Sequence, residues 1–176
     1  GPNIPNYAVI DKKRNCLYVS DSFAFGEKGI GVYKFDLQTG KGGPCTEELF
    51  NFANGMCLSP DGNYLYVIES FHPCVSRLKV NDDGSLGKKE VFTEEISTVP
   101  DGLAFDKNEN LFISCYEPSR IYMSDKSGNC QILIEDPHCT TLAHPTNIAI
   151  SQDGKTMFTA NLGRWHITKI DISSLY

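Results

Sequence analysis

Short apolar runs alternate with turn residues along the whole chain, and the pattern recurs at a regular interval. Each repeat opens with a polar residue, continues through an apolar run and a turn, and ends in a second apolar run. The opening polar residues are Asn6, Asn54, Asp101 and Asn147. Four β-rich repeats of about 46 residues are typical of folds in which similar β units stack on one another.

Each repeat predicts an antiparallel set of strands. Residues 54–58 and 65–69 are β-rich runs separated by Asp61-Gly62-Asn63, which favours a tight hairpin. A third, alternating run follows in every repeat, at residues 31–36, 75–79, 120–123 and 166–170. A fourth, outer strand is expected at residues 47–50, 89–92 and 131–134, and none is expected in the last repeat. The sequence carries no helical periodicity.

Four-stranded units at this period predict an all-β fold, a β-propeller of four repeats. We expect a single propeller domain over residues 1–176. Its blades lie at about 1–50, 51–96, 97–140 and 141–176. We expect these blades to be part of a six-bladed ring, completed by a missing N-terminal part or by a second chain. Closure of the four blades on themselves is the alternative.

The polar residues that open the inner strands are candidates for a shared site, because inner strands line the channel of a propeller. Asparagine and aspartate oxygens are hard ligands that suit Ca²⁺ or Mg²⁺. The alternative is plain turn chemistry, in which Asn and Asp are common. His144, three residues before Asn147, could move protons near neutral pH or serve only as a loop residue. Asp21 and Glu69, after the second strands, could support the site or form loop hydrogen bonds.

Two segments carry a resemblance to a known family. Asn54-Gly55-Met56, followed by Ser59-Pro60-Asp61-Gly62, is the first, and Val99-Pro100-Asp101-Gly102-Leu103 is the second. The chain resembles the SMP-30/gluconolactonase family, whose relatives include diisopropylfluorophosphatase, paraoxonase and the lactonase Drp35. The resemblance covers almost the whole chain.

The resemblance implies a hydrolase of lactones or esters that depends on a divalent metal, Ca²⁺ or else Mg²⁺, Mn²⁺ or Zn²⁺. Asn54 and Asp101 match metal ligands of the family, and Asn6 matches a second asparagine that contacts metal or substrate. Asp101 also matches the catalytic residue. Asn147 and His144 are expected to contact substrate. A glutamate ligand of the family has no counterpart in the chain, and Ile4 replaces an arginine that contacts sugar lactones.

Composition narrows the remaining classes of function. The formal net charge of -6 and the scattered basic residues argue against binding of nucleic acid. No apolar run reaches the roughly 20 residues of a membrane-spanning helix. Seven cysteines without a zinc-binding spacing are expected to be mostly reduced, which favours a cytoplasmic location. Two alternatives to the enzyme remain: a non-catalytic propeller that binds a partner, and an inactive fragment of a lactonase.

Overall fold

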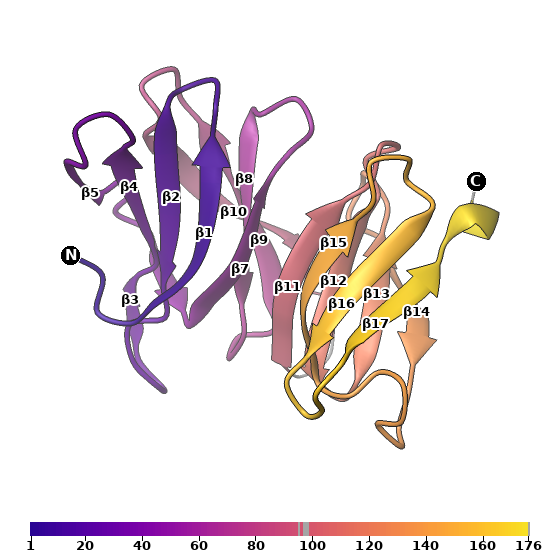
Figure 1. Ribbon diagram of the computed structural model, residues 1–176. Coiled ribbons are helices and arrows are strands. Elements are labelled where there is room, and N and C mark those ends of the chain that lie inside the picture. The colour runs from indigo at the N-terminus through magenta and orange to yellow at the C-terminus, as the bar shows by residue number, and fades with distance from the viewer. Residues whose placement is uncertain (95, 97–98, 176) are drawn as a thin grey trace. The chain divides into compact units, whose positions relative to one another are not determined.

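The computed structural model describes residues 1–94, 96 and 99–175 of the chain. The chain divides into two compact units, Gly1–Glu94 and Glu95–Tyr176, each built from antiparallel sheets (Figure 1). One short 3₁₀-helix, η1 (Ser173–Leu175), follows the last strand. No helix within the described residues is long and apolar enough to cross a membrane.

The first unit contains two four-stranded sheets, which we name blade 1 and blade 2. Blade 1 has the strand order β1-β2-β4-β5, with bounds Pro5–Asp11, Cys16–Asp21, Val32–Asp36 and Gly42–Pro44. Blade 2 has the order β7-β8-β9-β10, with bounds Ala53–Leu58, Tyr64–Glu69, Cys74–Val80 and Leu86–Thr93. The inner, second and third strands of both blades confirm the pattern predicted from the sequence.

The outer strand predicted at residues 47–50 is wrong. The outer strand of blade 1 is β5, whereas β6 (Leu49–Asn51) pairs with β3 (Lys28–Ile30) in a separate small sheet. A short Gly-rich run is a poor predictor of a strand, and this explains why β5 was missed. The outer strand predicted at residues 89–92 is confirmed within β10.

The second unit contains blade 3 and blade 4. Blade 3 has the order β11-β12-β13-β14, with bounds Val99–Phe105, Leu111–Glu117, Arg120–Ser124 and Cys130–Glu135. Blade 4 has three strands in the order β15-β16-β17, with bounds Pro145–Ile150, Thr156–Asn161 and Ile167–Asp171. The absence of a fourth strand in blade 4 was predicted, and it holds for the described residues.

Two of the inner hairpins close through the same local chemistry. In the turn of blade 2, Ser59 Oγ donates to the Asp61 carboxylate at 2.5 Å and accepts from the backbone N–H of Tyr64 at 3.0 Å. Gly62 adopts a positive φ of 70° there, a conformation that glycine tolerates best. Ser151, Asp153 and Gly154 repeat this arrangement in blade 4. The tight hairpin predicted at Asp61-Gly62-Asn63 is confirmed.

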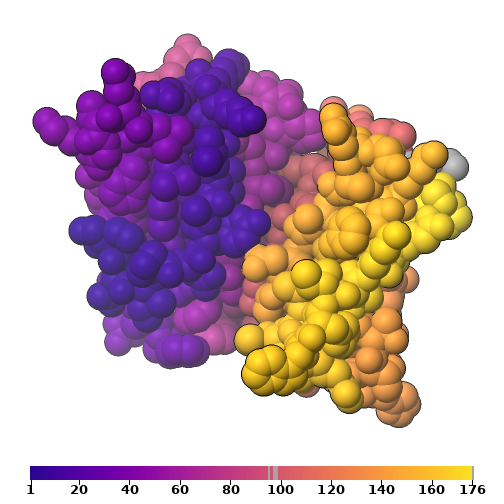
Figure 2. All heavy atoms as spheres, in the orientation of Figure 1, coloured from indigo at the N-terminus to yellow at the C-terminus, as the bar shows by residue number. Residues whose placement is uncertain are grey.

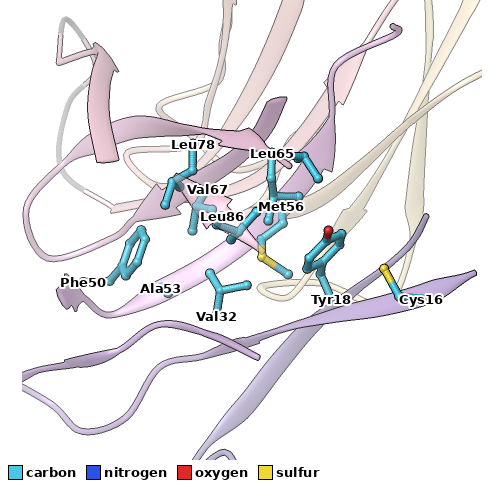
Figure 3. Packing of buried hydrophobic residues seen from close by; sticks show 11 residues of the cluster. Cys16, Tyr18, Val32, Phe50, Ala53, Met56, Leu65, Val67, Leu78 and Leu86 are labelled. Carbon is cyan, nitrogen blue, oxygen red and sulfur yellow. The ribbon is translucent and has the colours of Figure 1, made fainter. Parts of the chain in front are cut away.

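The core of the first unit is packed between blade 1 and blade 2. Figure 3 shows side chains from both sheets meeting, with Tyr18 and Val32 of blade 1 facing Met56 and Leu65 of blade 2. Each of these four side chains is at most 1% exposed. Burial of a side chain of this size stabilises a fold by roughly 1.5–3 kcal/mol, so this contact stabilises the packing of blade 1 against blade 2.

The core of the second unit joins blade 3 to blade 4 in the same way. Phe112 and Ile121 of blade 3 pack in one cluster with Ile148 and Met157 of blade 4. The last strand, β17, lies at the surface of this unit, in yellow in Figure 2, and its Ile167 is 69% exposed. Adjacent blades within each unit therefore share a core, as stacked repeats require.

Candidate functional site

Strand register determines which residues occupy the same position in the four inner strands. In every blade, a residue at the start of the inner strand pairs with one near the end of the second strand. These pairs are Pro5–Asp21, Ala53–Glu69, Pro100–Cys115 and Pro145–Asn161. The residues that follow them in the inner strands are Asn6, Asn54, Asp101 and Thr146.

The fourth repeat is therefore shifted by one residue from the alignment predicted from the sequence. Thr146 takes the position of Asp101, whereas Asn147 takes the position of Gly102. The register of all four inner strands slips just after this point, so the slip itself does not distinguish blade 4; what differs is the residue that pairs with the second strand, and an apolar pattern does not show it. Asn147 itself is exposed on β15. The equivalence predicted for Asn147 is wrong, and its contact with substrate stays a prediction.

In blade 1, a serine orients the side chain of Asn6. The Asn6 Nδ2 amide donates to Ser22 Oγ at 3.0 Å. Ser22 Oγ in turn donates its one hydrogen to the carbonyl oxygen of Ala53 at 3.0 Å, so it can only accept from Asn6. This fixes the orientation of the amide and directs Asn6 Oδ1 away from Ser22. Asn6 is exposed to solvent.

Blade 2 repeats the arrangement with Asn54 and Ser70. The Asn54 Nδ2 amide donates to Ser70 Oγ at 3.1 Å, across the same sequence separation of 16 residues as between Asn6 and Ser22. Asn54 is only 5% exposed, whereas Asn6 is exposed to solvent. Within the first unit, two matched asparagines thus have their amide nitrogens engaged by matched serines.

Asp101 in blade 3 stands on a closely packed strand. It is half-buried on β11, and a Cβ on the following residue, Gly102, would overlap the carbonyl oxygen of Thr146. Glycine at this position therefore allows β11 and β15 to approach each other.

Burial raises the pKa of the nearby Cys115 thiol to about 12, and the charges of Cys130 and Asp101 add to that effect.

His144 is held by blade 3. Its Nδ1 atom lies 3.0 Å from the Tyr116 carbonyl oxygen and 3.0 Å from the Glu117 carboxylate. Its backbone N–H donates to Ser119 Oγ at 2.9 Å, and its ring lies 4.8 Å from the ring of Tyr116, centroid to centroid. With its proton on Nδ1, the imidazole keeps its lone pair on Nε2.

Asp21, Glu69 and Asn161 have a common structural task at the same blade position. Asp21 accepts the backbone N–H groups of Asn3 and Ile4 at 2.9 and 2.7 Å. Glu69 accepts from the N–H of Asn51 at 2.8 Å, and Asn161 Oδ1 accepts from the N–H of Ala143 at 2.8 Å. In each case the donor lies just before the inner strand. Asp21 and Glu69 were expected either to support the site or to form loop hydrogen bonds, and the structure shows the loop hydrogen bonds.

One carboxylate accepts several backbone N–H groups of the loop that leads to His144. Asp136 accepts from the backbone N–H groups of Thr140, Thr141 and Leu142 at 3.0, 2.8 and 3.0 Å. These hydrogen bonds, those from Thr141 and Leu142 above all, hold the pKa of Asp136 far below its ordinary value.

We expect Asp136→Asn to lower the melting temperature at neutral pH, with an effect that depends on pH. A lowered pKa in the folded state gives stability that is present above the unfolded pKa, about 4, and is lost as pH falls through the folded pKa. The difference in melting temperature between the wild type and the variant should therefore decrease below about pH 4. Thermal unfolding followed by circular dichroism from pH 7 to pH 2 checks this, with the exposed Asp82→Asn as control. A difference in melting temperature that stays constant down to pH 2 contradicts the prediction.

The histidine, cysteine and acidic side chains of the described residues form no metal-binding cluster. All seven cysteines are free, which agrees with the reduced thiols predicted. No group of three or more His, Cys, Asp and Glu side chains within residues 1–94, 96 and 99–175 could hold a metal ion. The predicted ligand set has a different make-up, with two asparagines and one aspartate.

Sequence reasoning missed Ser22 and Ser70. Both serines directly follow the residue that anchors the inner strand, and both stand 16 residues after their asparagine. This repeated spacing is visible in the sequence and could have identified them.

Comparisons with known proteins identify a family and relatives of this chain. A family model described as the SMP-30/Gluconolactonase/LRE-like region matches residues 1–163. A gluconolactonase from Zymomonas mobilis is 31% identical over 115 residues, which cover 60% of this chain and 31% of that protein. Lactonase drp35 from Staphylococcus epidermidis is 27% identical over 125 residues, covering 68% of this chain and 38% of that protein. The match thus spans about a third of the length of these curated relatives.

Solved structures agree at the level of the fold. The gluconolactonase XC5397 from Xanthomonas campestris has a TM-score of 0.74 at 19% identity, covering 91% of this chain and 55% of that one. Regucalcin from Agrobacterium tumefaciens, described as a calcium-binding protein, has a TM-score of 0.72 at 20% identity, covering 92% and 55%. The β-propeller predicted from the repeats is confirmed by this likeness. The six-bladed ring stays a prediction.

Proposed function

We propose that this chain, which belongs to the SMP-30/gluconolactonase/LRE-like family, acts in the hydrolysis of lactones or related esters with the help of a divalent metal ion. Two curated relatives are named gluconolactonase and lactonase, which supports the reaction class. The observation that carries the proposal is the recurrence of Asn6, Asn54 and Asp101 at one register position, with both asparagines oriented by serines.

The donor set fits a hard divalent cation. Asn54 and Asp101 are the proposed ligands, and Asn6 is a third ligand or a contact to substrate. Amide and carboxylate oxygens suit Ca²⁺ best among the ions considered, ahead of Mg²⁺, Mn²⁺ and Zn²⁺. The description of regucalcin as a calcium-binding protein supports the same choice. When bound, such an ion supplies Lewis-acid polarisation of an ester carbonyl.

The chain's own residues account for positioning and proton transfer. Ser22 holds the Asn6 amide by its nitrogen, so that its carbonyl oxygen is presented as an acceptor for a ligand group. The Asp101 carboxylate is the proposed general base toward water. His144 presents Nε2 as a second proton acceptor, because Nδ1 is engaged by Tyr116 and Glu117. Asn147, exposed on β15, is a proposed contact to substrate.

Hydrolysis of simple lactones by the purified 176-residue chain tests the proposal. The acid released from glucono-1,5-lactone and from 3,4-dihydrocoumarin is followed by pH-stat in calcium, after chelation, and after calcium is returned. We expect turnover that is lost with the chelator and restored by calcium. A chain that is folded by circular dichroism and hydrolyses neither lactone contradicts the catalytic proposal and favours a binding module. Turnover that is insensitive to the chelator contradicts the metal.

A further inference from the structure

We infer that three aromatic rings of the first unit, Phe25, Phe52 and Phe71, form a platform that holds the apolar ring or chain of the lactone substrate. This inference rests on the proposed function, because it names the substrate class of the same site. We call these three residues the aromatic platform. They take no part in the ion binding or the proton transfer proposed above.

The three rings form one continuous cluster. Their centroids lie 5.1 Å apart for Phe25 and Phe52, 5.6 Å for Phe25 and Phe71, and 4.5 Å for Phe52 and Phe71. All three pairs are tilted contacts within the range of favourable aromatic pairs. Phe25 is nevertheless 75% exposed and Phe71 40% exposed. The cluster is therefore ordered by its own contacts while a large apolar surface faces solvent.

The backbone that carries the platform is the backbone that orients the two asparagines. Ser70 holds the Asn54 amide through Oγ, and its backbone N–H donates to the Phe52 carbonyl oxygen at 3.1 Å. Phe71 is the next residue after Ser70. Phe25 belongs to the loop that starts at Ser22, the serine that orients Asn6. The platform thus stands at the same end of the blades as Asn6 and Asn54.

Phe52 adopts a backbone conformation that is unfavourable for a bulky residue. Its φ is 62°, in the left-handed region that bulky side chains rarely adopt. The hydrogen bond from Ser70 fixes this bend directly before the inner strand. Residues kept in such conformations cluster at functional sites.

The matched position in blade 1 is also apolar. Ile4 precedes Pro5 as Phe52 precedes Ala53, and the register of the two inner strands makes Ile4 and Phe52 equivalent. The backbone bond recurs as well, since the N–H of Ser22 donates to the Ile4 carbonyl oxygen at 3.0 Å. Neither side chain can hydrogen-bond the hydroxyl groups of a polyol. Both favour a substrate that carries an apolar group beside its ester.

Binding of lactams to the full chain tests the platform without relying on turnover. Lactams resist hydrolysis, so their affinity can be measured by calorimetry whether or not the chain is an enzyme. The aromatic probe is 3,4-dihydroquinolin-2(1H)-one, and the polyol probe is gluconolactam. We expect the wild-type chain to prefer the aromatic probe, and Phe25→Ala and Phe71→Ala each to weaken its binding by about fivefold to tenfold. Binding of the polyol probe should change little.

Ile10→Ala is the matched control, because Ile10 is 56% exposed in the same unit but lies at the other end of β1. It should leave both affinities unchanged. The inference is overturned if the aromatic probe does not bind, or if Phe25→Ala and Phe71→Ala bind it as the wild type does. It is also overturned if these variants change only self-association, measured by sedimentation equilibrium, since a second copy would then cover the rings. Preserved aromatic preference in a chain that hydrolyses no lactone would refute the proposed reaction and leave the platform standing.

Discussion

Replacing Asp101 by asparagine is expected to lower lactone hydrolysis by about 100-fold or more at saturating calcium. The substitution keeps the size of the side chain and an oxygen donor, but it removes the negative charge. Both proposed roles of Asp101 need that charge, since it strengthens ion binding and lets the carboxylate accept a proton. Initial rates with 3,4-dihydrocoumarin, measured over a range of calcium concentrations, check the prediction.

Asp153→Asn is the control for the loss of a carboxylate. Asp153 is exposed in the turn of blade 4. Among the described residues, its carboxylate accepts hydrogen bonds from Ser151 and Lys155 of the same turn. The control should retain nearly full activity. If Asp101→Asn hydrolyses the lactone as fast as Asp153→Asn does, Asp101 has neither proposed role.

The second large effect concerns stability. Glu69→Ala is expected to destabilise the first unit by about 3–5 kcal/mol, because it removes a buried acceptor that three donors share. Glu69 is 2% exposed and accepts from Lys89 Nζ at 2.8 Å, from Ser76 Oγ at 2.9 Å and from the N–H of Asn51 at 2.8 Å. Urea unfolding at pH 7 measures the change in free energy.

Glu90→Ala is the control for Glu69→Ala. Glu90 belongs to an exposed ion pair, whereas Glu69 forms a buried ion pair with Lys89 in the same blade. The Glu90 side chain is 61% exposed, and its contact with Arg77 is 3.3 Å long. An exposed pair of this kind contributes about 0–1 kcal/mol, so Glu90→Ala should unfold close to wild type. Equal destabilisation by the two alanine variants would show that Glu69 has no special role as an anchor.

The repeat was the part of the fold that the sequence could reveal. The apolar runs of β7 and β8 and the turn at Asp61-Gly62 are local signals, and the structure forms them as predicted. Stacking between blades buries these runs, so their apolar character was informative. The inner position of Asn54 and Asp101 also followed from the repeat, since it depends only on where each inner strand begins.

Features that depend on contacts between segments distant in sequence could not be predicted from the local sequence. The equivalence of Thr146, rather than Asn147, with Asp101 depends on which residue of β15 pairs with Asn161 of β16, and the apolar pattern of β15 does not reveal that pairing. The partner of β6 is β3, a short strand between β2 and β4, and no local signal in β6 indicates this pairing. The aromatic platform likewise joins Phe25 to Phe52 and Phe71 from segments far apart in sequence.

Calcium titration by calorimetry on the 176-residue chain, beside Asn54→Ala and Asp101→Ala, tests whether these two residues bind the ion. We expect one site on the wild-type chain, with an affinity that falls sharply in both variants while circular dichroism shows that they remain folded. A folded wild-type chain that binds no calcium, or one whose affinity is unchanged by both substitutions, would contradict the claim that these two residues hold the ion.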